Sequence, residues 1–154
     1  MAHVELSLSG AFVPQARTPA EAEFVAGIGR WTSTVAAAPE ACLVIDVTTT
    51  IMAVSRSCSE LLGIGPPVDV VGRPLFGGVL RLIDFTAGGG ELAELEIEQI
   101  PPLLAIRSEQ LARGLMRVQP TTGGQHMTVD AIATPLLQDD QVVASLTFFS
   151  AIRY

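Results

Sequence analysis

The sequence predicts an α+β fold: a five-stranded antiparallel sheet with short helices on one face, preceded by a flanking helix. Two short β-branched segments come first, then a stretch broken by Gly and Pro with short runs of helical spacing, and the last third alternates as strands do. Strands separated from a run of helices are typical of α+β domains, whose antiparallel sheets commonly bury one face. We therefore expect a tail (1–17), a flanking helix (18–38) and one domain (39–154).

The flanking helix has a clear start and end. Thr18 can cap it, Pro19 suits its first position, and Glu21 completes a capping box. The pair Ala38-Pro39 ends it, because a residue before proline avoids the helical region. The helix carries one apolar stripe at helical spacing: Phe24, Ile28, Trp31 and Val35.

The next segments predict a β-hairpin followed by short helices. Residues 42–47 and 51–54 are β-branched and separated by three Thr, a hairpin pattern. Ser57 and Glu60 form a second capping box, for a helix that Gly63 ends. Residues 70–85 suggest short helical turns, and 91–111 suggest helix interrupted by Pro101-Pro102.

The last third predicts a three-stranded meander over 114–119, 125–134 and 141–152. Residues 121–124 and 138–140 supply the turns. By alternation we place Met127, Val129, Ala131 and Ala133 on the core face, and Val142, Ala144, Leu146 and Phe148 beside them. The outer face then receives Ile132, Val143 and Phe149.

Composition disfavours several partners and cofactors. The net charge is −7 and all nine basic residues are Arg, which disfavours nucleic acid and anionic membranes. No apolar run reaches the roughly 18 residues that span a bilayer. Cys42 and Cys58 have neither a disulfide pattern nor metal-ligand spacing, so we expect no metal and a reduced, cytoplasmic compartment.

Four short sequence motifs, in the order given below, resemble motifs of the PAS family of sensory domains. Residues 43–46 with 51–55 look like its opening hairpin, and 58–63 like the helix that comes next. Residues 70–75 are similar to its "GRPL" turn, and 127–136 with 141–149 to its closing hairpin. The resemblance covers about three-quarters of the chain and implies a non-catalytic sensory or interaction module of a bacterial signalling protein. Such a module works with a partner protein or a fused output domain.

The chain also departs from that family. Ser55 stands where Asn is common, although Ser can still cap a helix. Residues 78–112 are longer than the usual middle and carry four Glu. The reactive Cys of flavin photoreceptors has no counterpart after Arg73, and 91–111 contain no His for haem. We therefore expect no cofactor.

Two sets of residues are candidates for binding. An apolar ligand such as a fatty acid would lie against Val79, Leu80, Ile83, Met116, Met127, Val129, Leu146 and Phe148, with small neighbours (Ala53, Ala131, Ala133 and Ala144) leaving room. Alternatively these residues simply fill a core. A homodimer interface would use Phe24, Ile28, Trp31, Val35, Ile132 and Phe149, although packing within one chain is the alternative.

Two other classes of function stay open. One is a structural dimerisation module that binds no ligand. The other is a small α+β enzyme that uses Asp46 or Asp130, for which a buried carboxylate of raised pKa would be the sign.

Overall fold

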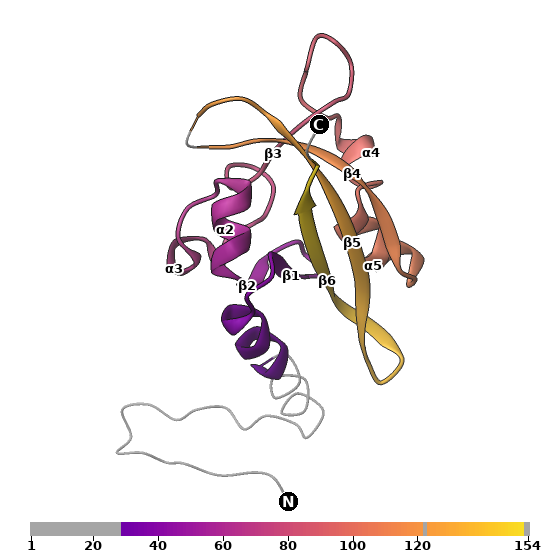
Figure 1. Cartoon of the computed structure of the whole chain (residues 1–154). Coiled ribbons are helices and arrows are strands. Elements are labelled where there is room, and N and C mark those ends of the chain that lie inside the picture. The colour runs from indigo at the N-terminus through magenta and orange to yellow at the C-terminus, as the bar shows by residue number, and fades with distance from the viewer. Residues whose placement is uncertain (1–28, 122, 153–154) are drawn as a thin grey trace, which may run out of the picture. The chain divides into compact units, whose positions relative to one another are not determined.

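Six antiparallel strands form one sheet in the described part of the chain, in the order β2-β1-β6-β5-β4-β3 (Figure 1). The structure is a computed structural model that describes residues 29–121 and 123–152. The chain divides into two units, Met1–Arg30 and Trp31–Tyr154, and the sheet belongs to the second unit. The elements of that unit are β1 (Cys42–Asp46), β2 (Ile51–Val54), α2 (Arg56–Leu62), α3 (Pro67–Val70), β3 (Arg81–Ile83), α4 (Glu94–Ile97), α5 (Pro101–Ser108), β4 (Ala112–Gln119), β5 (Met127–Gln138) and β6 (Gln141–Ala151).

The α+β prediction is confirmed, with one strand more than expected. The additional strand is β3, which lies where the sequence suggested helical turns and pairs only three residues with β4. A three-residue strand is too short to show alternation, so its pattern could not be read. Both hairpins and the meander are as predicted, and the last turn places Asp139 and Asp140 at φ of 52° and 63°. Asp tolerates these left-handed angles better than most residues.

The start of α2 differs from the predicted capping box. Ser55, and not Ser57, caps this helix, and its hydroxyl accepts a hydrogen bond from the Cys58 amide. The Ser57 hydroxyl donates instead to the carbonyl of Pro39. The helix ends as expected at Gly63, whose φ of 62° suits glycine best.

The flanking helix lies mostly outside the described residues. Residues 29–37 are helical, and the predicted end before Pro39 agrees with them. Phe24, Ile28 and the predicted tail lie outside the described residues.

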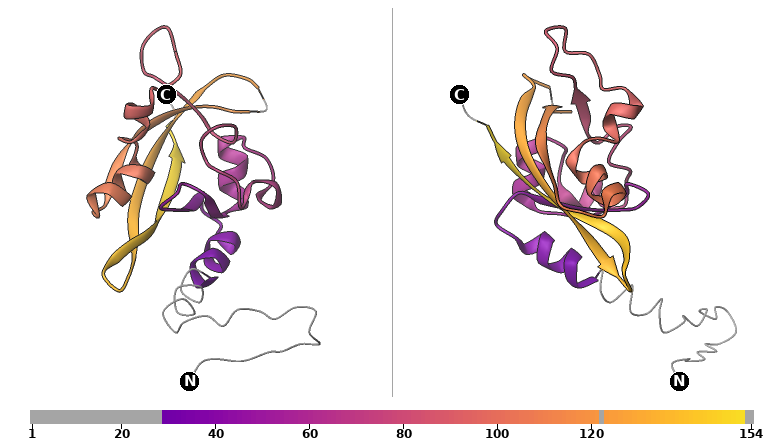
Figure 2. Two further views of the ribbon diagram at one scale, coloured as in Figure 1. Left: turned by 180° about the vertical axis from the view of Figure 1, so that it is seen from behind. Right: turned by 90° about the vertical axis from the view of Figure 1, so that its right-hand side faces the viewer.

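The sheet has two unlike faces, which we call the helix face and the open face. The helix face carries Leu43, Ile45, Met116, Val118, Val129, Ala131 and Phe149, all members of one buried apolar cluster. Val54 of β2 also belongs to this cluster, which continues into Cys58, Leu62, Val70, Leu75 and Ile100 from the segments that cover this face. Strand pairing places the neighbours Cys42, Val44, Leu146, Phe148 and Ile132 on the open face. Figure 2 shows α4 and α5 together on one side of the sheet.

Helix α5 lies very close to β4, β5 and β6. Ala105 is fully buried against Ala112 and Ala133. A Cβ added at Gly114 would lie 3.4 Å from Cγ of Pro101. The Ser145 hydroxyl donates a 2.9 Å hydrogen bond to the Pro102 carbonyl. The small residues of the sheet therefore allow a helix to approach, and do not leave the room for a ligand that we expected there.

Candidate functional site

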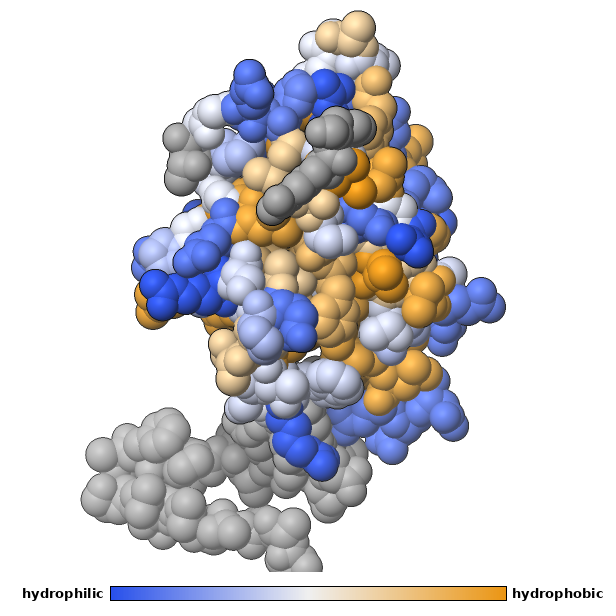
Figure 3. Space-filling model, viewed as in Figure 1, coloured by the Kyte–Doolittle hydropathy of each residue, from blue (hydrophilic) through white to orange (hydrophobic). Residues whose placement is uncertain are grey.

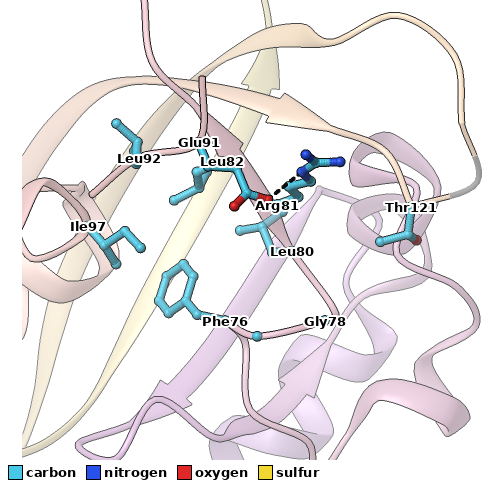
Figure 4. Close-up of a pocket in the computed structure, with 10 residues that line it drawn as sticks. Phe76, Gly78, Leu80, Arg81, Leu82, Glu91, Leu92, Ile97 and Thr121 are labelled. Carbon is cyan, nitrogen blue, oxygen red and sulfur yellow. Dashed lines mark hydrogen bonds and ion pairs between the residues drawn. The ribbon is translucent and has the colours of Figure 1, made fainter. Parts of the chain in front are cut away.

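A pocket of about 370 Å³ opens beside β3, at the edge of the sheet. Figure 4 shows its wall, which comes from the turn before β3, from β3 itself and from the segment leading into α4. The apolar lining residues are Phe76, Leu80, Leu82, Leu92 and Ile97; Gly77, Gly78, Arg81, Glu91 and Thr121 complete the wall.

The turn that forms one side of this pocket depends on two glycines. Gly77 and Gly78 have φ of 96° and 144°, angles that a residue with a Cβ rarely adopts. They reverse the chain so that the Leu80 amide donates to the Leu75 carbonyl at 2.9 Å and Phe76 lies beside Leu80. Leu75 is fully buried, so the turn is anchored in the core while Phe76 lines the pocket.

The pocket carries its charge as one ion pair. Nε of Arg81 donates to Oε1 of Glu91 at 2.6 Å, and both side chains are more than half exposed. The Thr121 hydroxyl donates to the Gly63 carbonyl at 2.8 Å. The two opposite charges satisfy each other, so the wall offers a ligand mainly apolar contact. This arrangement suits binding of a neutral or amphipathic molecule.

Of the residues that the sequence assigned to a ligand wall, Leu80 lines this pocket, although it is also a buried member of the core cluster. Val79, Met116 and Val129 are at most 4 % exposed in the core cluster, and Ile83 is also buried. Met127 packs against that cluster and is partly buried. The pocket residues Phe76, Leu92 and Ile97 were missed, because only the tertiary fold brings segments 76–82 and 91–97 together. No periodic pattern in the sequence signals that contact.

Leu146 and Phe148 require a correction, because they lie on the open face. Cys42 pairs with Phe148 and Val44 pairs with Leu146. Cys42 and Val44 flank the core residue Leu43 on β1, so they and their partners point to the face opposite Leu43. Phe148 is 42 % exposed, whereas Phe149 is 6 % exposed in the core cluster. Alternation was assigned the wrong way round in this strand because Ser145 and Thr147 are polar and yet buried. The carbonyl of Pro102 on α5 gives Ser145 a partner there.

The residues predicted for a dimer interface differ widely in exposure. Trp31 and Ile132 are 41 % and 37 % exposed, whereas Val35 is 2 % exposed. Phe149 cannot contribute to an outer surface, because it is buried on the helix face. Phe148 and Leu115 are exposed in its place, and strand pairing puts Phe148 directly beside Ile132. Figure 3 shows apolar surface gathered over the strands of this face.

The acidic residues considered for catalysis are engaged in structural contacts. Oδ1 of Asp46 accepts from the Thr48 and Thr50 amides and from the Thr48 hydroxyl, which stabilises the β1–β2 turn. Arg113 Nη2 donates to Asp130 at 2.6 Å, and this hydrogen bond lowers the pKa of Asp130. A lowered pKa is the reverse of what a buried general base would show.

The cysteines are also poorly suited to chemistry. Burial raises the pKa of both the Cys42 and the Cys58 thiol, which disfavours the reactive thiolate. Among residues 29–121 and 123–152, no three His, Cys, Asp or Glu side chains come together as a metal site would require. Nor does any described helix have the length and apolarity to cross a bilayer.

Comparison with known proteins identifies the fold. No protein-family model and no curated protein matches the chain. Among solved structures, the PAS domain of a protein from Colwellia psychrerythraea superimposes with a TM-score of 0.58 at 16 % identity, over 81 % of this chain and 96 % of that one. The PAS domain of nitrogen regulation protein NR(II) from Vibrio parahaemolyticus gives 0.54 at 13 % identity, over 79 % and 96 %.

A third match is to part of a longer protein. VqmA of Vibrio cholerae gives a TM-score of 0.57 at 16 % identity, over 80 % of this chain and 51 % of VqmA. VqmA also matches in a structure in which it is bound to DPO. The chain therefore has the PAS fold, as the short sequence motifs suggested.

Proposed function

We propose that this PAS-fold chain is a non-catalytic sensory module of a cytoplasmic bacterial signalling protein, which binds a small, mainly apolar molecule beside β3. The observation that carries the proposal is the pocket of about 370 Å³ with five apolar wall residues and one internally neutralised ion pair. Pockets of a few hundred Å³ with apolar walls and few polar groups are typical of small-molecule sites. The module would pass its state to a partner protein or a fused output domain.

The position of the pocket suggests how ligand binding would change the state of the domain. Its wall joins β3 to the segment before α4, so a ligand would hold the two together. Leu92 is tied to this strand already, because its amide donates to the Leu82 carbonyl at 3.2 Å. A ligand that favours one arrangement of these segments over another shifts the balance between the two states. VqmA, which has a similar fold and binds DPO, supports a small-molecule role by analogy.

Native mass spectrometry of freshly purified protein tests the proposal. We expect a bound small molecule in the wild type and its loss in Leu92→Trp, which fills the pocket with a larger side chain. Leu95→Trp is the matched control, because Leu95 belongs to α4, is 77 % exposed and does not line the pocket. A wild type without any bound mass from its native host, or equal occupancy in both variants, would argue against a ligand-binding role.

A structural dimerisation module is the second candidate, and a separate observation favours it. Leu115, Ile132 and Phe148 expose 53 %, 37 % and 42 % of their surface on the open face. Adjacent exposed apolar side chains often mark protein–protein contacts. Sedimentation of Phe148→Glu compared with Leu137→Glu tests this, since Leu137 is 54 % exposed near the β5–β6 turn. We expect a dimer that only Phe148→Glu dissociates; a monomeric wild type would exclude this candidate.

A further inference from the structure

A second pocket, of about 460 Å³, lies beyond the ends of β3 and β6 and shares no wall residue with the first. Its wall consists of Phe85, Arg117, His126, Met127, Thr128 and Ile152. Arg117 and Thr128 are direct cross-strand partners on β4 and β5. Arg113, Leu115 and Arg117 follow each other at two-residue steps on β4, so their side chains share one face of the sheet. Arg113 pairs with Ile132 on the open face, so Arg117 and its pocket also lie on the open face.

The Arg117 guanidinium is held in place by the loop after β3. Its Nη1 donates to the carbonyls of Asp84 and Thr86 at 3.0 and 3.3 Å. Phe85 lies between these two residues in sequence and is 59 % exposed. The same backbone contacts therefore fix a cation and present an aromatic ring to one pocket. A guanidinium that is already ordered loses little freedom when it binds a ligand.

The contact between Arg117 and His126 brings together more N–H donors than acceptor nitrogens. Nε of Arg117 lies 3.2 Å from Nδ1 of His126, and Nη2 lies 3.0 Å from Nε2. Both arginine nitrogens carry hydrogen, whereas a neutral imidazole has one donor nitrogen and one acceptor. In either tautomer one N–H of Arg117 therefore faces an N–H of His126. One N–H of Arg117 and the N–H of His126 therefore find no acceptor in this contact, and an oxygen atom lying beside the pair could accept from both.

The charge around the pocket favours an anionic acceptor. Arg117 is the only charged residue among the wall residues that the structure describes. The carboxylate of Asp84 accepts from the amide and hydroxyl of Thr86, and its charge also interacts with Arg117, so Asp84 offsets part of the positive charge. Asp130, on the same face, is paired with Arg113.

Apart from Thr128, the remaining wall residues are apolar, and one of them is an exposed ring. Phe85 can stack on a planar ligand in an offset arrangement, with Ile152 as a further apolar contact. We propose that this open-face pocket is a binding site for a small aromatic carboxylate, whose oxygens bridge Arg117 and His126 while its ring lies against Phe85.

Nuclear magnetic resonance titration of the whole chain with sodium benzoate tests the site. We expect the Nε–Hε signal of Arg117 and the amides of His126 and Thr128 to shift in a saturable way. Arg117→Gln should weaken benzoate binding at least about 10-fold, as expected for a lost charge-assisted hydrogen bond. Arg113→Gln is the matched control, being on the same strand and face but outside the pocket, and should change affinity less than about twofold.

A second variant separates loss of binding from loss of structure. His126→Phe leaves the Arg117 contacts to the loop carbonyls intact and removes the bridging partner, so it should also weaken benzoate binding. Methyl benzoate, which has no charge, and inorganic phosphate, which has no ring, should shift the same signals less than benzoate does. Absence of saturable shifts, equal effects of Arg117→Gln and Arg113→Gln, or equal binding of phosphate would overturn the proposal.

Discussion

Ser55 connects three segments through a single buried hydroxyl. Its Oγ accepts from the amides of Cys42 and Cys58 at 3.0 and 3.1 Å and donates to the Glu40 carbonyl at 2.7 Å. The residue has no exposed surface. Ser55→Ala therefore removes a helix cap and leaves the Cys42 amide, at the start of β1, without this acceptor.

The cost can be worked from these contacts. Loss of an N-cap costs about 1 kcal/mol, and a buried amide left unsatisfied costs about 1–3 kcal/mol. We expect Ser55→Ala to lower the free energy of unfolding by about 3 kcal/mol and the melting temperature by about 10 °C.

Urea unfolding monitored by circular dichroism measures this difference. Ser57→Ala is the control, because the Ser57 hydroxyl makes one exposed hydrogen bond, to Pro39, and its loss should cost less than about 1 kcal/mol. If both variants lose the same small amount, the Cys42 and Cys58 amides have other partners and the reasoning is wrong.

Three further predictions concern packing, pH and thiol reactivity. Gly114→Val should lower the free energy of unfolding in urea by about 2 kcal/mol, because the methyl groups of the valine would meet the Pro101 ring. Gly114→Ala should leave the free energy of unfolding nearly unchanged. The lowered pKa of Asp130 means that its pairing with Arg113 stabilises the fold above about pH 4 and is lost as the pH falls through the folded-state value. The urea midpoint of the wild type should therefore fall more than that of Asp130→Asn between pH 5 and pH 3, and parallel falls would contradict the pairing. The buried Cys58 thiol, with its raised pKa, should react with dithiobis(nitrobenzoate) only after unfolding, so rapid labelling of the native chain would refute its burial.

Local signals in the sequence were sufficient for the order of the strands other than β3. The two-residue alternation of β5, the Gln138-to-Gln141 turn and the stop at Gly63 each depend on neighbours along the chain. Alternation also placed Val129 and Ala131 on the buried face correctly. These features result from backbone geometry and burial of one face, which act within a few residues.

The face of β6 was decided by a partner far away in the sequence. Ser145 and Thr147 are buried on the helix face, and Ser145 finds its acceptor on Pro102 of α5, 43 residues away. A polar residue in a strand is read as exposed unless that partner is known. The same error exchanged Phe148 and Phe149.

By itself the sequence determined the fold class and five of the six strands that the structure describes. Only the tertiary structure decided where pockets lie. Helix α5 fills the space above Ala112, Ala133 and Gly114, so the β3 pocket lies at the sheet edge, between segments that carry no shared pattern. Pockets arise where packing between distant segments is incomplete, and that depends on side-chain volumes across the whole domain, which local periodicity does not encode.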